Sequence, residues 1–98
     1  MTEALEIVVF RLKAGKDAGF AAANRLVSYW LVRQPGFISR QLARRDDGSW
    51  IDVIRWQSRA LALAAAERLL AEIGDCEAMQ AIDLASIDMS HATVALTA

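Results

Sequence analysis

Two residues of the sequence combine a titratable side chain with a setting in which it could move a proton. Asp52 lies in the run WIDVIRW, on the same face of a predicted strand as Trp50, Ile54 and Trp56. A carboxylate on such a face must be paired, change its protonation or meet water. His91 is the only histidine, and imidazole titrates near neutral pH. We therefore predict Asp52 and His91 as catalytic residues; on one sheet face, a hydrogen bond between them could fix the imidazole tautomer.

Each of these residues also has a purely structural interpretation. Asp52 can form an ion pair with Arg40 or Arg44 on the neighbouring strand, instead of orienting or deprotonating a ligand. His91 can be a hydrogen-bonded residue of the core or of an interface, instead of a proton shuttle. The sequence leaves both alternatives open.

Large aromatic and basic side chains add candidates for ligand binding. Trp30 and Trp56 are predicted to point between a helix and the sheet, either as core residues or as walls of a pocket for a flat ligand. Arg40 and Arg55 can form ion pairs at a sheet edge or interface, or bind an anion. We expect Trp30, Trp56 and Arg40 to bind substrate, and Cys76 to act as a small buried hydrophobic residue.

The composition excludes several classes of function. One cysteine and one histidine rule out an internal disulfide, a thiolate metal cluster and a multi-histidine metal site. The net charge of −1 gives no electrostatic basis for binding nucleic acid or an anionic membrane. The sequence has no nucleotide-binding or hydrolase motif, and from its hydropathy we expect no signal peptide and no membrane span. We expect no metal, no cofactor and a cytoplasmic location.

Hydropathy patterns divide the 98 residues into the elements of a single domain, residues 1–98. Strands are predicted at 5–12, 37–45, 49–56 and 86–96, and helices at 16–34 and 59–73, with a short turn up to residue 82. Asp46, Asp47 and Gly48 predict a hairpin. Ser58 is expected to cap the second helix, and Gly74 to follow it as the C′ residue.

The order of these elements, β-α-β-β-α-β, predicts an α+β, ferredoxin-like fold. Such a fold has a four-stranded antiparallel sheet with two helices on one face, which leaves the other face bare. The first and third strands carry apolar residues on both faces, and monomers rarely expose a patch of that size. We expect a second copy to cover the open face in a homodimer; the alternative is a monomer with a modestly apolar open face.

Several motifs in order resemble a known family. Pro35-Gly36-Phe37, the hairpin DDGSWIDVIRW ending at Trp56, the alanine-rich helix and Met89-Ser90-His91 are similar to the antibiotic-biosynthesis-monooxygenase-like group of dimeric α/β barrels, and to its small bacterial members above all. The resemblance spans residues 6–94. It implies a ferredoxin-like homodimer with a pocket between helices and sheet in each subunit.

Members of this group differ in activity. Some are cofactor-free monooxygenases that act on phenolic polyketides, and others degrade haem. Trp56 matches the tryptophan that ends the third strand of the haem-degrading members. Their asparagine on the first strand and their histidine after the second helix have no counterpart in residues 5–12 and 74–82. The resemblance therefore argues against haem degradation in this chain.

Together these observations predict a cofactor-independent monooxygenase or isomerase acting on a small aromatic or polyketide-like molecule. Asp52 or His91 would manage the proton, and Trp30 and Trp56 would hold the ring. The alternative is a homodimer that binds a small molecule or plays a structural role without chemistry of its own. An open cavity with Asp52 and His91 at its wall favours the enzyme; a filled core in which both are paired with protein groups favours the alternative.

Overall fold

The computed structural model describes residues 2–98 and has the predicted order of elements. The order is β-α-β-β-α-β, with two short additions before the last strand. The elements are β1 (Ala4–Phe10), α1 (Phe20–Leu31), β2 (Phe37–Arg44), β3 (Trp50–Trp56), α2 (Arg59–Ile73), α3 (Glu77–Gln80), the 3₁₀ turn η1 (Leu84–Ser86) and β4 (Asp88–Thr93).

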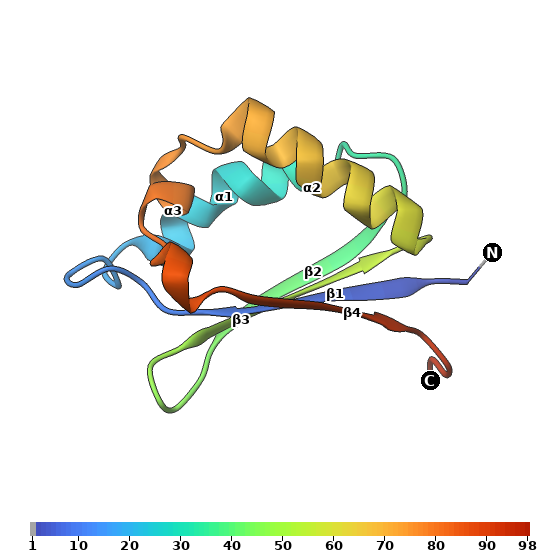
Figure 1. Cartoon of the computed structure of the whole chain (residues 1–98), viewed down its shortest axis with the longest axis horizontal. Helices are drawn as coiled ribbons and strands as arrows, with labels where there is room; N and C mark the ends of the chain where they lie inside the picture. The colour runs from blue at the N-terminus through green and yellow to red at the C-terminus, as the bar shows by residue number, and fades with distance from the viewer. Residues whose placement is uncertain (1) are drawn as a thin grey trace.

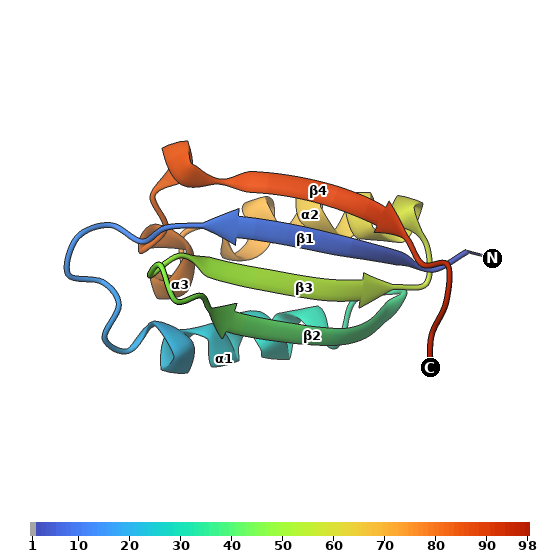
Figure 2. The same ribbon diagram turned by 90° about the horizontal axis from the view of Figure 1, so that it is seen from below.

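The four strands form one antiparallel sheet in the order β2-β3-β1-β4. Both long helices and α3 lie on one face of this sheet (Figure 1). Seen from the other side, the strands are bare, and the two chain ends lie at the same end of the sheet (Figure 2). This layout confirms the predicted ferredoxin-like α+β fold.

Two glycines with left-handed backbones flank the first helix. The sequence pattern predicts a helix over residues 16–34, but α1 begins only at Phe20 because Gly19 adopts a left-handed backbone with φ of 82°. Beyond the helix, Gly36 has φ of 85°, and a Cβ atom there would lie 2.5 Å from Leu61 Cδ1. Both the turn and the close approach of α2 therefore require glycine at position 36.

The second helix begins as expected and ends differently. The Ser58 hydroxyl accepts a hydrogen bond from the backbone N–H of Leu61 at 3.2 Å, which confirms Ser58 as the N-cap. Gly74 is the C-cap of the helix, with a right-handed φ of −60°, so its assignment as the C′ residue is wrong. A side chain at position 74 would instead collide with the carbonyl oxygen of Leu70, and this contact explains the glycine.

The core lies between the sheet and the helices. Phe20 packs edge-on against Phe10 and Trp50, with ring centres 5.8 and 4.9 Å apart. Trp56 and Leu31 are the largest side chains in the described chain that are almost fully enclosed. The helix-facing positions of the central strands also include two acidic residues, Glu6 and Asp52.

The opposite face of the sheet carries an apolar centre. Its half-buried residues alternate with the helix-facing ones along β1 and β3: Leu5, Ile7, Val9, Ile51 and Val53. Polar side chains such as Ser39, Gln41 and Ser90 flank this centre on the outer strands. The prediction of apolar residues on both faces of the central strands is thus confirmed. Within residues 2–98, no helix is long and apolar enough to cross a membrane.

Candidate functional site

A cavity of about 260 Å³ separates the helices from the sheet. Its wall is mainly apolar, with side chains from every layer: Val8, Phe10, Phe20, Val27, Leu31, Ile54, Ala66, Leu69, Ala78, Met79 and Ile82. Leu70, Ile87 and Met89 also line it and are exposed, so the mouth lies beside β4. An apolar cavity with a few polar groups is the usual form of a small-molecule site.

Arg40 on β2 is the centre of a buried polar network at one end of this cavity. Its Nε and Nη2 atoms donate to the Asp52 carboxylate at 3.0 and 2.8 Å. Its Nη1 donates to the Ser28 hydroxyl at 2.9 Å and to the Asn24 carbonyl at 3.5 Å, and Nη2 also donates to Asn24 Oδ1 at 2.7 Å. A guanidinium has five N–H groups, and all five have acceptors within the protein.

The ion pair decides between the two partners considered for Asp52. Arg40 engages both carboxylate oxygens, and the two side chains are 7% and 13% exposed. Arg44 instead approaches Asp17 at 3.7 Å on the surface. Asp52 therefore lies on the cavity wall as the paired member of a bidentate contact that ties β3 to β2 and α1.

Glu6 on β1 is a buried carboxylate that the sequence interpretation missed. It lines the cavity, is 5% exposed, and pairs in register with His91 on β4. Its Oε2 atom lies 3.4 Å from His91 Nε2. Burial raises the pKa of the Glu6 carboxyl, while His91 and the Trp56 indole lower it and Asp52 adds to the increase. A carboxyl whose pKa is raised in this way is a stronger base than an exposed glutamate.

Three buried polar atoms in this corner have no hydrogen-bond partner of good geometry. They are Glu6 Oε2, His91 Nε2 and Trp56 Nε1. The three residues are neighbours on the helix-facing side, because Glu6 pairs with His91 and Ala4, two residues before it, pairs with Trp56. Their polar groups are near enough to influence one another but too poorly aligned for full hydrogen bonds. Buried polar groups in proteins are nearly always satisfied. Of the three residues only Glu6 lines the cavity as described, so its carboxyl is the group that a ligand atom could reach.

The sequence matches no family model and no curated protein. Solved structures do match. The haem-degrading protein MhuD from Mycobacterium tuberculosis superposes with a TM-score of 0.79 at 19% identity, over 97% of this chain and 98% of that one. A candidate antibiotic biosynthesis monooxygenase from Bordetella bronchiseptica gives 0.74 at 16% identity, over 98% and 100%. SnoaB, a cofactor-independent oxygenase from Streptomyces nogalater, gives 0.63 at 20% identity, over 100% and 96%.

The chain has the antibiotic-biosynthesis-monooxygenase-like fold. The resemblance noted in the sequence is confirmed at the level of fold, since the match extends over nearly the whole length of each chain. Sequence identities near 20% establish the fold alone, so the roles of individual residues in this monooxygenase-like fold depend on the geometry described above.

Within this fold, the two predicted catalytic residues do not contact each other. Asp52 pairs in register with Val8, whereas His91 pairs with Glu6 on the other side of β1. The hydrogen bond between Asp52 and His91 is therefore not formed: Asp52 is bonded to Arg40, and His91 faces Glu6. Asp52 lines the cavity. His91 does not line it as described, and contacts the cavity residue Glu6 from the neighbouring strand β4.

The two tryptophans are core residues. The Trp30 indole N–H donates to Glu72 on α2 at 3.0 Å, so this side chain joins the two helices. Trp56 packs edge-on against Phe37 and is 1% exposed. Among residues 2–98, neither indole lines the cavity. Arg55 is the other basic candidate. Its Nε atom lies 2.9 Å from the Glu3 carboxylate, and Arg55 does not line the cavity as described.

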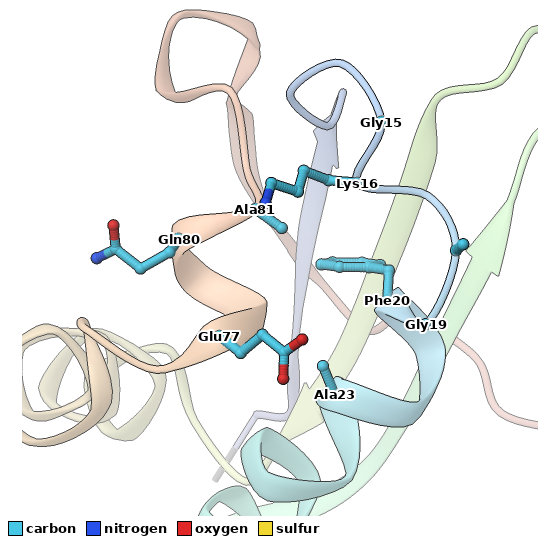
Figure 3. A pocket seen from close by; sticks show the side chains of 9 residues that line it. Gly15, Lys16, Gly19, Phe20, Ala23, Glu77, Gln80 and Ala81 are labelled. Carbon is cyan, nitrogen blue, oxygen red and sulfur yellow. The ribbon is translucent and has the colours of Figure 1, made fainter.

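A second hollow lies outside the core, between the start of α1 and α3. Lys16, Glu77 and Gln80 surround it together with glycine backbone, and the Phe20 ring forms its inner side (Figure 3). The charged and amide side chains here are exposed to solvent. Solvated charges at a surface hollow do little chemistry, so the helix–sheet cavity is the better candidate.

Proposed function

We propose that this protein binds a small, mainly apolar aromatic molecule in the helix–sheet cavity and oxygenates or isomerises it without a bound cofactor. The observation that supports this most directly is the cavity itself: apolar on most sides, with Glu6, Arg40 and Asp52 at its polar end. Aromatic molecules that carry an acidic proton become electron-rich once deprotonated and can then react with molecular oxygen or rearrange. The neighbour SnoaB, a cofactor-independent oxygenase, supports the oxygenase form of the proposal.

Haem, which MhuD binds in its active site, is less well matched to the cavity. The single histidine, His91, faces Glu6 from β4 and, among the described residues, is not part of the cavity wall. The cavity therefore offers no imidazole to coordinate the iron. The proposed substrate is a metal-free aromatic or polyketide-like molecule.

The proposed assembly is a homodimer that buries the open faces of two sheets against each other. Its support is the half-buried apolar centre of β1 and β3, which no element of the described chain covers. A two-fold pair is the simplest arrangement that covers such a self-complementary face. The cytoplasmic location expected from the sequence stays a prediction.

A non-catalytic binding protein is the second candidate, and one observation favours it. Asp52 is fully engaged by Arg40, as a structural interpretation of both residues requires. Under this alternative the cavity would still bind an aromatic molecule, but no group would move a proton.

A thermal-shift screen tests the proposal. The panel holds polycyclic phenols, quinols, aromatic acids and haem, because a ligand that binds only the folded state must raise the melting temperature. We expect the neutral phenols and quinols to stabilise the protein more than haem does. Stabilised mixtures are then incubated in air and followed for oxygen consumption and new products. Failure of every aromatic compound to stabilise the protein would contradict the proposal.

A further inference from the structure

The pair Glu6–His91 is less well bonded than the other charged pair of the site. The Arg40 network joins three elements through satisfied hydrogen bonds, whereas the facing atoms of Glu6 and His91 lack good partners. A carboxyl at 5% exposure whose Oε2 atom lacks a well-aligned hydrogen bond is expensive to bury. Such a group in a cavity points to a role toward a ligand.

We propose that Glu6 is the general base of this cavity, with His91 as the residue that positions and tunes it, and that the substrate is an uncharged aromatic molecule with an acidic C–H or O–H. The inference rests on the proposed function and names its substrate class. In the step, the C–H or O–H bond of the substrate breaks, the electron pair stays on the substrate, and the proton moves to the Glu6 carboxylate.

The surroundings of Glu6 support this assignment from each side. β4 contributes His91, and β3 contributes Asp52 and the Trp56 indole. α2 presents only apolar side chains to the cavity within the described residues, among them Ala66 and Leu69. Burial also raises the pKa of the Glu6 carboxyl, which strengthens it as a base.

The charge of the ligand follows from Arg40. It is the one cationic side chain on the described cavity wall, and its five N–H groups already have protein acceptors. An anionic ligand would find no free donor from it and would lie near two carboxyl groups. The site therefore favours a neutral molecule that becomes an anion only after Glu6 has accepted its proton.

The test uses 5-nitrobenzisoxazole, a neutral aromatic probe whose ring-opening requires only a base. The base takes the C–H proton, the C–H electrons form the nitrile, the N–O bond breaks, and a coloured phenolate is released. Glu6→Gln keeps the size of the side chain but cannot accept the proton. We expect its rate to fall by about 100-fold or more relative to the native chain. Glu67→Gln, at an exposed position on α2, is the matched control and should stay within about two-fold.

The rate of the native chain as a function of pH gives a second readout, which does not depend on whether Glu6→Gln folds. In the native chain the rate should rise through a midpoint above 4.5, the ordinary pKa of a glutamate. His91→Gln removes a group that lowers the Glu6 pKa, so the midpoint should move to higher pH. A purely structural role of His91 would leave the midpoint unchanged.

Binding of 5-nitroindole, a neutral analogue of the probe that has no N–O bond to break, separates the two proposals. If this analogue binds but Glu6→Gln retains the native rate, the general-base assignment is wrong and the cavity remains a ligand site. If the native rate does not exceed that of acetate at the same concentration, or the pH profile is flat, the assignment is equally wrong. If no aromatic compound binds, both the assignment and the proposed function fail.

Discussion

Glu6 Oε2 and His91 Nε2 lie 3.4 Å apart, on paired residues from the first and last strands of the sheet. Neither atom has a well-aligned hydrogen bond, and the carboxylate lines the helix–sheet cavity. The titratable groups of the site thus form two separate pairs: Glu6 with His91, and Asp52 with Arg40. The first pair is proposed to handle protons, and the second holds the sheet to α1.

Glu6 should make stability fall as pH rises. Below pH 4.5 the carboxyl is protonated in both folded and unfolded chains. Above 4.5 the unfolded chain releases its proton first, while burial keeps the folded pKa higher. The folded state then binds more protons, so its stability decreases until pH passes the folded pKa. In urea denaturation, the free energy of unfolding of Glu6→Gln should increase relative to that of the native chain over this pH range. A constant difference between the two from pH 4 to 8 would contradict this.

Arg40→Ala should destabilise the fold by about 3 kcal/mol, because it leaves the buried Asp52 carboxylate without its partner. Arg44→Ala removes a surface contact with Asp17 whose side chains are about half exposed. This control should cost about 0.5 kcal/mol or less. Denaturant midpoints of the two variants measure the contrast, and equal losses would show that the Arg40 network is not the stabilising one.

Trp30→Phe should weaken the fold and leave ligand binding unchanged. The substitution removes the hydrogen bond to Glu72, worth about 1 kcal/mol, whereas Trp30 does not line the cavity as described. Dissociation constants for a bound aromatic compound, measured by calorimetry, should agree within about two-fold. A tenfold weaker affinity would restore Trp30 to the substrate-binding role predicted from the sequence.

Gly36→Ala should destabilise the protein by more than about 1 kcal/mol. The residue has a left-handed backbone, and the added methyl group would meet Leu61 Cδ1 at 2.5 Å. Gly15 has a similar φ with open space around it, so Gly15→Ala isolates the backbone cost. Melting temperatures should be lower for Gly36→Ala than for Gly15→Ala, and the reverse order would contradict the tight contact.

The proposed dimer predicts a sedimentation mass of about twice 10.7 kDa. Ile7→Lys places a charge in the apolar centre of the open face and should shift the mass toward 10.7 kDa. Leu26→Lys, on the exposed side of α1, is the control and should remain dimeric. A native chain that sediments as a monomer at micromolar concentration would exclude the dimer.

The sequence predicted the fold well because local signals determined most of it. The hairpin glycine, the Ser58 cap and the helical spacing of residues 59–73 each act over a few residues. The pairing of the site is not local. Asp52 pairs in register with Leu42, so Arg40 and Arg44 are both diagonal neighbours of it. Acceptors on α1, Ser28 and Asn24, hold the Arg40 guanidinium beside Asp52, whereas Arg44 approaches Asp17 on the surface.

Glu6 was missed because its neighbours Val8 and Phe10 made its face of β1 look apolar. The useful signal was the single charged residue in the run LEIVVF. A lone acid at a position that must face the core indicates a cavity or a partner. His91 as that partner could not be foreseen, because it depends on how the two ends of the chain align.

The pairing of β1 with β4 also has a consequence for folding. Glu6 lies on the first strand of the sheet and His91 on the last, so their contact closes a loop that contains every other element. A chain that has formed the hairpin and both long helices still lacks half of the proposed proton-handling pair. That pair is therefore complete only after β4 has docked along β1.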